Sequence, residues 1–181
     1  MKYTSIVISG KVATGTTTAA KNIAKKLNLQ YHCAGDFYRQ YVLEHNIPLY
    51  DKAQFPDELD RKLDEELTKL ARKGGVVIDA HYIGYFTRNM PQVLKVLLTC
   101  DYKERIRRAT TRTHTHQETE EDIKKREEGL DTKFRKLYAD ENFLNPKFFD
   151  LVIDNTNIPE EETLARILKK FNQKDSEQEE A

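Results

Sequence analysis

The chain has 181 residues, which is enough for one domain with a full hydrophobic core. Its 30 Lys and Arg residues balance its 30 Asp and Glu residues, which disfavours a generally basic nucleic-acid-binding surface and leaves only local basic patches open. The sequence has no apolar signal segment, and no run approaches the ~18 apolar residues of a membrane span, so we expect a soluble cytoplasmic domain. Cys33 and Cys100 lie in or beside apolar runs, so we expect two reduced thiols rather than a disulfide.

Short apolar runs alternate with amphipathic stretches along the chain. The apolar runs predict strands at residues 3–9, 29–33, 76–78, 93–98 and 151–153. The amphipathic stretches predict helices at residues 16–27, 37–44, 57–72, 101–113, 118–138 and 159–171. Because buried strands alternate with helices, we predict a single α/β domain over residues 1–172, with a parallel sheet covered on both faces. Residues 173–181 are polar and acidic, which predicts a disordered tail.

The candidate binding and catalytic residues stand where the predicted strands end. They follow the first four strands and begin at Gly10, Ala34, Asp79 and Asp101. In a parallel sheet, the carboxyl ends of the strands lie at one edge, and ligands bind there. We therefore expect one ligand site at this edge.

A glycine-bounded loop follows the first strand. Its spacing, Gly10-x4-Gly15-x-Thr17, is typical of a loop that holds phosphate with backbone N–H groups and a helix N-terminus. Thr17 stands at the position whose hydroxyl usually meets Mg²⁺. Thr16 stands where a lysine is usual, and Lys11 either replaces that charge or points to solvent. The alternative is an ordinary turn with a threonine cap. The residues expected to contact the nucleotide are Gly10, Lys11, Val12, Ala13, Thr14, Gly15, Thr16, Thr17 and Thr18.

Asp79 closes the buried strand at residues 76–78. A carboxylate there lies beside the loop and would hold Mg²⁺ through water, as a Walker B acid does. The alternative is a turn residue that caps the next segment. Asp154 also ends a strand, but Asn155 and Thr156 follow it, which favours a turn.

Two further charged groups are candidates for binding a second, acceptor substrate. Asp36 and Arg39 lie one helical turn apart after the second strand, and an arginine binds phosphate with a planar fork. A surface ion pair between Asp36 and Arg39 is the alternative. Asp60, Arg61 and Asp64 on the long helix either line the same acceptor site or form a solvated charged face.

Basic residues also recur on two later helices. Arg105, Arg108 and Arg112 share one helix face, and Arg126 and Lys133 lie seven positions apart on the following helix. These stripes flank a polar link and predict a lid that brings positive charge onto transferring phosphates.

Local ion pairing is the alternative for the basic stripes. Glu104 and Arg108, for example, have the i,i+4 spacing of a helical ion pair. His114 and His116 lie on the polar link without other ligands at metal spacing, so we interpret them as exposed polar residues.

Taken together, these motifs resemble those of a nucleoside monophosphate kinase, most closely the archaeal-type cytidylate kinases. The resemblance covers about residues 2–171 and depends on the order and spacing of several segments. They are Ile8-Ser9-Gly10, Gly15-Thr16-Thr17-Thr18, Ala34-Gly35-Asp36-Phe37-Tyr38-Arg39, Leu59-Asp60-Arg61-Lys62-Leu63-Asp64-Glu65, Val76-Val77-Ile78-Asp79, the Arg105/Arg108/Arg112 series, Lys125-Arg126-Glu127-Glu128 and Phe149-Asp150-Leu151-Val152-Ile153.

The resemblance implies a P-loop kinase fold and an activity. The fold is a three-layer sandwich with a five-stranded parallel sheet, an acceptor-binding segment at about residues 34–73 and a helical lid at about residues 108–135. The activity is transfer of the γ-phosphoryl group of ATP to CMP or dCMP with Mg²⁺. We expect a monomer that binds small nucleotides and neither nucleic acid nor membranes.

The resemblance also implies roles for individual residues. The catalytic set is Arg126, Lys133, Arg112 and Asp79. Arg108 contacts the nucleotide, and the Mg²⁺ ligands are Thr17 and Asp79. The acceptor-binding set is Asp36, Arg39, Arg61 and His81.

Three positions depart from the family pattern. Thr16 replaces the loop lysine, His81 stands where an acceptor-binding arginine is usual, and Lys133 replaces a second lid arginine. Two alternatives therefore remain open: a kinase for AMP or another small metabolite, and a nucleotide-binding regulatory protein with little turnover.

Overall fold

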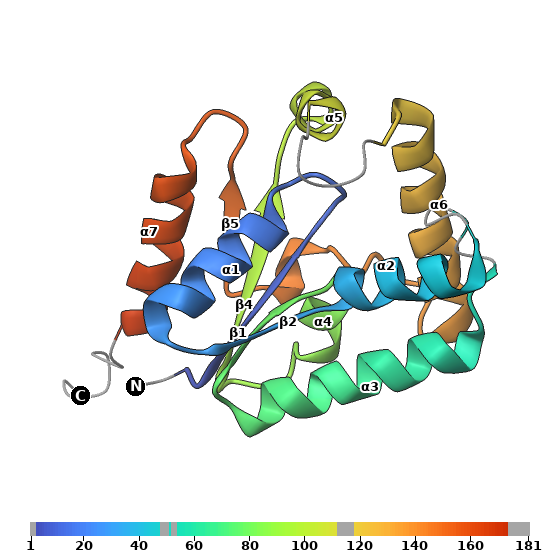
Figure 1. Ribbon diagram of the computed structural model, residues 1–181. Helices are drawn as coiled ribbons and strands as arrows, with labels where there is room; N and C mark the ends of the chain where they lie inside the picture. The colour runs from blue at the N-terminus through green and yellow to red at the C-terminus, as the bar shows by residue number, and fades with distance from the viewer. Residues whose placement is uncertain (1–2, 48–50, 52–53, 112–117, 174–181) are drawn as a thin grey trace.

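A five-stranded parallel sheet forms the centre of the fold (Figure 1). This is a computed structural model, and it describes residues 3–47, 51, 54–111 and 118–173. The strands are β1 (Ser5–Gly10), β2 (Gln30–Cys33), β3 (Val76–Asp79), β4 (Val93–Thr99) and β5 (Leu151–Asp154). Their order across the sheet is β2-β3-β1-β4-β5, and each neighbouring pair is parallel.

The helices cover both faces of the sheet and extend beyond its carboxyl edge. They are α1 (Thr16–Leu27), α2 (Ala34–His45), α3 (Asp57–Lys73), α4 (Ile83–Phe86), α5 (Tyr102–Thr110), α6 (Glu120–Leu137), the 3₁₀ helix η2 (Pro146–Phe148) and α7 (Glu160–Asn172). Figure 1 shows α1 and α7 on one side of the sheet and α3 on the other, with α5 and α6 at the upper end. The predicted α/β fold with helices on both faces is confirmed.

The central strand shows why the sheet is covered on both faces. Ile6 and Ile8 of β1 join a buried cluster that includes Ile167 of α7. Val7, which lies between them, joins a second cluster that includes Leu67 of α3. Successive side chains of a strand point to opposite faces, so a continuous apolar run needs a helix layer on each side.

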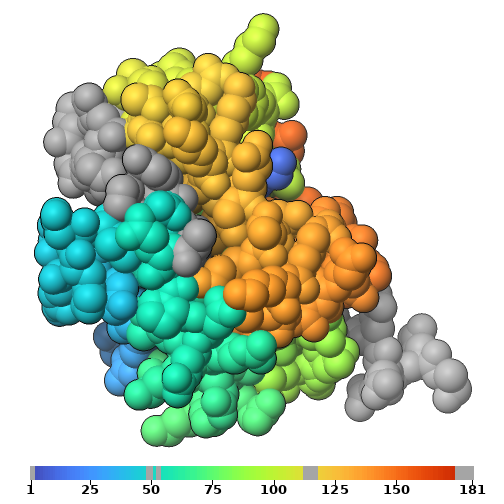
Figure 2. Space-filling model, turned by 90° about the vertical axis from the view of Figure 1, so that its right-hand side faces the viewer, coloured from blue at the N-terminus to red at the C-terminus, as the bar shows by residue number. Residues whose placement is uncertain are grey.

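Helix α6 packs against a cluster of aromatic rings beside the sheet. Phe134 is fully buried, and its ring centroid lies 5.2 Å from that of Tyr82, 4.9 Å from that of Tyr85 and 5.0 Å from that of Phe143. Figure 2 shows α6, in gold, between α5 above it and the green residues of α3 below it. The aromatic cluster therefore anchors α6 beside the sheet.

The structure differs from the predicted elements mainly at boundaries and short helices. The first strand begins at Ser5 rather than residue 3, and α2 begins at Ala34 rather than residue 37. Helix α4 and η2 are absent from the prediction, because helices of four and three residues are too short to show a periodic pattern. The predicted tail lies outside the described residues except for Gln173. Among the helices that the structure describes, none has the length and apolar character to cross a membrane.

Candidate active site

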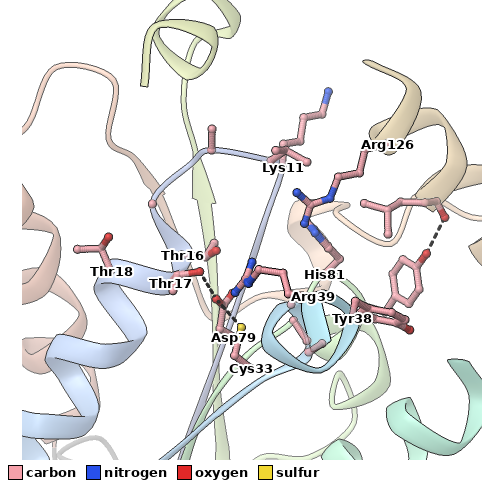
Figure 3. A pocket seen from close by; sticks show the side chains of 18 of the residues that line it. Lys11, Thr16, Thr17, Thr18, Cys33, Tyr38, Arg39, Asp79, His81 and Arg126 are labelled. Carbon is pink, nitrogen blue, oxygen red and sulfur yellow. Dashed lines mark hydrogen bonds between the residues drawn. The ribbon is translucent and has the colours of Figure 1, made fainter. Parts of the chain in front are cut away.

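A cavity opens at the carboxyl edge of the sheet, beside the loop that connects β1 to α1 (Figure 3). Its volume is about 360 Å³, which is in the range of small-molecule sites. The loop, the start of α1, the β2–α2 junction, the end of β3, and helices α3 and α6 all contribute side chains to its walls. The cavity thus lies at the edge where the sequence predicts a ligand site.

The loop is shaped by close backbone packing. A Cβ atom at Gly10 would overlap Oγ1 of Thr14 and lie 2.8 Å from the carbonyl oxygen of Leu98, so a side chain does not fit there. Gly15 has a φ of +87° and Ala13 a φ of +64°, both in the left-handed region. This geometry leads the chain directly into α1, whose first residues line the cavity. The N–H groups at the start of α1 are therefore placed for an anion.

Asn155 supports the loop from the opposite side. Its Nδ2 donates to the carbonyl oxygen of Thr14 at 2.7 Å. Arg108 in turn donates to Oδ1 of Asn155 at 3.1 Å, to its carbonyl oxygen at 2.9 Å, and to Glu104 at 2.8 Å. Arg108 does not line the cavity, so the structure places it behind the loop and not at the predicted nucleotide contact. The i,i+4 pair with Glu104, which the sequence left as an alternative, is present.

Arg105 and Glu127 hold another part of the loop. Arg105 is buried, and it donates to the carbonyl oxygen of Val12 at 2.9 Å and to Oε1 of Glu127. The same oxygen of Glu127 accepts from the N–H of Val12 at 3.1 Å. Both backbone polar groups of Val12 are thus bound by side chains of α5 and α6. Arg105 therefore supports the loop and does not extend a basic stripe into the cavity.

Asp79 ends β3 inside the cavity. Oγ1 of Thr17 donates to Oδ2 of Asp79 at 2.5 Å, and the thiol of Cys33 donates to the same oxygen at 3.5 Å. Burial raises the pKa of Asp79, and hydrogen bonds from Thr17 and Thr16 oppose this shift. Burial, together with the charge of Asp79, raises the pKa of the Cys33 thiol to about 11, so the thiol keeps the proton that it donates.

The pair of Thr17 and Asp79 has the chemistry of a Mg²⁺ site. Mg²⁺ prefers oxygen ligands and is usually bound through one or two carboxylates together with phosphate oxygens. Within the described ranges, no group of three or more His, Cys, Asp or Glu side chains forms a metal cage. The buried carboxylate and the adjacent hydroxyl are the oxygen groups at this place that would hold a Mg²⁺ ion.

Arg39 extends from α2 into the cavity. Its guanidinium points toward Asp79 in Figure 3, and its positive charge lowers the pKa of that carboxyl, against the effect of burial. Arg39 also pairs with Asp36, one turn earlier on α2. The ion pair that the sequence left as an alternative is present, and the arginine nevertheless faces the cavity. Asp36 does not line the cavity, and its side chain is 52% exposed.

Lys11 of the loop and His81, which follows β3, both line the cavity. Lys11 is exposed, and Figure 3 shows its ammonium group pointing away from Thr17. In this arrangement, Lys11 does not replace the charge that is missing at Thr16. Nδ1 of His81 lies 2.9 Å from the carbonyl oxygen of Gly10. Because a carbonyl can only accept, Nδ1 carries the hydrogen and Nε2 of the neutral ring is an acceptor.

Arg126 of α6 brings a positive charge to the cavity. Its guanidinium donates to both carboxylate oxygens of Glu118, at 3.0 and 3.2 Å, and both residues line the cavity. Glu118 is buried, so this is a largely desolvated pair. In Figure 3 the guanidinium lies between Lys11 and His81. Arg126 is therefore the predicted lid residue that the structure brings to the cavity.

Lys133, which the sequence placed in the predicted site, lies away from the cavity. Its side chain is only 7% exposed. Its Nζ donates to the carbonyl oxygen of Phe55 and pairs with Asp60 at 2.8 Å and Asp57 at 3.3 Å. Asp60 is buried, so its charge would be costly without a cation, whereas Asp57 is partly exposed. Lys133 thus connects α6 to α3 in this structure.

Two other predicted site residues also lie away from the cavity or outside the described residues. Arg61 is exposed, and its guanidinium carbon lies 5.9 Å from the ring centroid of Tyr138, outside the cavity lining. Arg112 lies outside the described residues, as do His114 and His116.

The cavity is also lined by two tyrosines, an aspartate and a leucine, which are Tyr38, Tyr82, Asp64 and Leu130. The sequence left the role of Asp64 open and did not single out the other three. Aromatic residues and leucines at helical spacing are typical of a core, so their pattern does not mark a binding site. The one usable signal is that Tyr82 follows closely after the strand end at Asp79.

Curated relatives match almost the whole chain. A cytidylate kinase of Ignicoccus hospitalis is 33% identical over 172 residues, which cover 93% of this chain and 98% of that protein. The chain belongs to the nucleoside monophosphate kinase family, archaeal type. A cytidylate kinase of Archaeoglobus fulgidus is 32% identical to this kinase, and the match covers 91% of this chain and 92% of the Archaeoglobus protein. A protein-family model described as an AAA domain matches residues 6–131 of the kinase.

Solved structures share the fold of the kinase at lower identity. A gluconokinase from Sinorhizobium meliloti has a TM-score of 0.65 at 15% identity and covers 94% of this chain and 93% of that one. A shikimate kinase from Bacteroides thetaiotaomicron has a TM-score of 0.61 at 17% identity and covers 93% of this chain and 98% of that one. These similarities confirm the predicted P-loop kinase fold.

The substitution Asp79→Asn is expected to raise the melting temperature of the ligand-free kinase at pH 7. It keeps the shape of the side chain and removes a charge that burial disfavours. Because the folded-state pKa of Asp79 is raised, its ionisation destabilises the folded protein above the ordinary pKa of aspartate. The gain should therefore be present at neutral pH and disappear below about pH 4, which thermal melts at several pH values would measure.

Asp154→Asn is the matched control for this measurement. Hydrogen bonds from Thr156 lower the pKa of Asp154, so its ionisation favours the folded state. The control should lose stability at pH 7 relative to the parent, and this loss should fade as the pH falls through the range in which Asp154 becomes protonated. A melting temperature below that of the parent for Asp79→Asn at pH 7 would show that the buried carboxylate is not destabilising.

The substitution Lys133→Met is expected to lower the free energy of unfolding of the kinase by about 3–5 kcal/mol, because Asp60 stays buried without its cation. Lys136→Met is the control, since Lys136 pairs with Asp57 from an exposed position on the same helix and should change stability by less than about 1 kcal/mol. Urea unfolding measures both values. A stable Lys133→Met variant with reduced turnover would instead restore the sequence-based role at the phosphates.

Proposed function

We propose that the kinase transfers the γ-phosphoryl group of ATP to CMP or dCMP in a Mg²⁺-dependent reaction. Two curated relatives that match nearly the whole chain are cytidylate kinases. The observation that carries the proposal for this chain is one continuous cavity. Its lining includes the loop, Asp79, Arg39, two tyrosines and Asp64. Such a cavity has room for a donor phosphate chain to meet an acceptor nucleotide.

The donor half would bind ATP through the loop. Backbone N–H groups of the loop and of the first turn of α1 face the cavity and suit the negative charge of the phosphates. Thr17 and Asp79 are the residues that would hold Mg²⁺, which supplies charge neutralisation on the phosphates when bound. The loop therefore positions the donor without the lysine that Thr16 replaces.

Two arginines would supply the remaining positive charge. Arg39 faces the cavity, where it would bind the phosphate of the acceptor with a bidentate fork, and His81 lies beside that position. Arg126 would stabilise the charge on the phosphoryl group during transfer. Since Arg126 now donates to Glu118, it would exchange or share this partner when the phosphates are bound.

No general base is required in this proposal. A phosphate oxygen of the acceptor is already anionic at neutral pH, whereas a hydroxyl acceptor usually needs a positioned carboxylate. We further propose that residues of about 34–73 bind the acceptor, that residues of about 108–135 form a lid, and that the kinase acts as a monomer on small nucleotides.

An acceptor panel tests the proposed activity. Purified kinase with ATP and Mg²⁺ would be offered CMP, dCMP, UMP, AMP and GMP, and ADP release would be followed. We expect the highest kcat/KM for CMP or dCMP. Activity on AMP alone would move the assignment to another acceptor class. ATP binding without turnover of any acceptor would favour a regulatory nucleotide-binding protein.

The substitution Arg126→Ala is expected to lower kcat at least about 100-fold, with a smaller effect on the KM for ATP, because the guanidinium acts mainly on charge that develops during transfer. Arg126→Lys keeps the charge and loses the fork, so it should retain part of the rate. Arg135→Ala on the same helix is the control, since Arg135 pairs with Asp131 on an exposed face. Steady-state kinetics would check all three, and an unchanged kcat in Arg126→Ala would remove this residue from the proposed mechanism.

A further inference from the structure

The loop between β1 and α1 contains a strained turn. The N–H of Thr14 donates to the carbonyl oxygen of Lys11 at 3.3 Å, and Oγ1 of Thr14 donates to the same oxygen at 2.9 Å, so residues 11–14 form a β-turn. Ala13, the third residue of this turn, has a φ of +64°, whereas the φ of Val12 is not positive. A β-turn with positive φ at its third residue alone is type II, which usually has glycine at that position. The left-handed region disfavours an alanine by about five- to thirtyfold in an equilibrium constant.

A type II turn differs from the commoner type I turn in the orientation of its central peptide. Both central residues of a type I turn have negative φ, so an alanine is unstrained there. A flip of the peptide between Val12 and Ala13 would convert the observed turn into type I. The strain at Ala13 therefore indicates that contacts from outside the turn hold this peptide in its present orientation.

Arg105 of α5 and Glu127 of α6 provide these contacts. Nη1 of Arg105 donates to the carbonyl oxygen of Val12 at 2.9 Å and also to Oε1 of Glu127. The N–H of Val12 donates to the same Oε1 at 3.1 Å, which closes a ring of three hydrogen bonds. In a type I turn the carbonyl of Val12 would point away from Arg105, whose side chain is only 3% exposed. The loss of an acceptor is costly for a buried cation, so the ring opposes the flip.

Apolar packing around the ring keeps it largely dry. Val12 and Ala13 belong to a buried cluster with Ala109 of α5 and Ile123 of α6. Ile123 and Glu127 are four positions apart, so they lie on the same face of α6. Hydrogen bonds between charged groups are stronger in such surroundings than in water. The ring is therefore strong enough to offset the strain of one left-handed alanine.

The orientation of this peptide determines which polar group the loop offers a ligand. In a trans peptide the N–H points opposite to the carbonyl. Because the carbonyl of Val12 points to Arg105, the N–H of Ala13 points away from α5. Ala13 lines the cavity, whereas Arg105 and Glu127 do not. A backbone N–H is favourable beside a phosphate, whereas a carbonyl oxygen in its place would repel one.

We propose that Glu127 and Arg105 are positioning residues for the donor nucleotide, because they hold the Val12–Ala13 peptide in the orientation that presents the N–H of Ala13 to a phosphate. This inference rests on the proposed function, which assigns the loop to ATP. If the ring is broken, the unstrained turn becomes populated in the free enzyme. ATP must then shift this equilibrium back, and its apparent affinity falls by the fraction of loops that are competent.

Glu127→Gln tests this role, since the amide keeps the shape of the side chain and removes the charge that holds the ring. The dissociation constant for ATP, measured by calorimetry without acceptor, should rise by about five- to thirtyfold, the factor set by the strain at Ala13. The KM for CMP at saturating ATP should change by less than about twofold, because the turn belongs to the donor half. Glu128→Gln is the matched control, since Glu128 is exposed at the next position of α6. The control should keep the parental affinity for ATP.

Ala13→Gly distinguishes a positioning role from a purely structural one. Glycine adopts positive φ without strain, so Ala13→Gly combined with Glu127→Gln should restore most of the affinity for ATP. Asn28→Gly is the control for this rescue. Asn28 also has a left-handed φ, +53°, but it ends α1 at the opposite end from the loop, so Asn28→Gly should restore none of the affinity.

Glu127→Asp is the second variant if Glu127→Gln does not fold. It keeps a negative charge near Arg105 and withdraws the carboxylate from Val12 by one methylene, so the dissociation constant for ATP should rise by a smaller factor. Parental affinity for ATP in every folded Glu127 variant, or a loss that Ala13→Gly does not restore, would overturn the positioning role. A parent enzyme that binds ATP and prefers another acceptor would overturn the proposed function and leave this inference standing.

Discussion

The phosphate-binding loop has Thr16 where a lysine is usual, and the buried carboxylate of Asp79 lies beside it. Asp79 is desolvated, and burial raises its pKa even with hydrogen bonds from Thr17 and Thr16. Nucleotide phosphates would add negative charge to the same space. Positive charge must therefore come from other parts of the chain, and this requirement explains why the cavity is enclosed by elements that lie far apart in the sequence.

The structure meets this requirement through two arginines on separate helices. Arg39 approaches from α2 and Arg126 from α6, while Lys11 of the loop points away. Each arginine has a carboxylate partner, Asp36 or Glu118, that keeps its fork oriented when no phosphate is bound. A lysine at position 16 would be a point charge within the loop, whereas these arginines belong to two other helices, α2 and α6. Because Lys11 points away and Thr16 carries no charge, the positive charge that faces the cavity depends on tertiary structure.

The sequence predicts the loop, the strand-end acid and the alternation of strands and helices, because each is a local pattern with a local cause. It does not predict which basic residues reach the cavity. Arg108, Arg126 and Lys133 look alike in the sequence, yet Arg108 binds Asn155 and Lys133 binds Asp60. The partner of a long cationic side chain depends on which buried carboxylates and carbonyls lie within reach, and this is a property of packing. The tyrosines and the leucine that line the cavity escape prediction for a similar reason, since these residues also suit a core.

The two contacts of α6 at Lys133 and Arg126 have a mechanical consequence. The residues are seven positions apart, which corresponds to about 10 Å along a helix. Lys133 is held to α3 by the buried Asp60 and by Asp57, which makes this contact one pivot point of α6, and Arg126 lies toward the other end of the helix. A tilt of about 10° around this pivot moves Arg126 by about 2 Å, which is enough to make or break a hydrogen bond. The spacing of Lys133 and Arg126 thus determines how far the Arg126 guanidinium moves for a given tilt of α6.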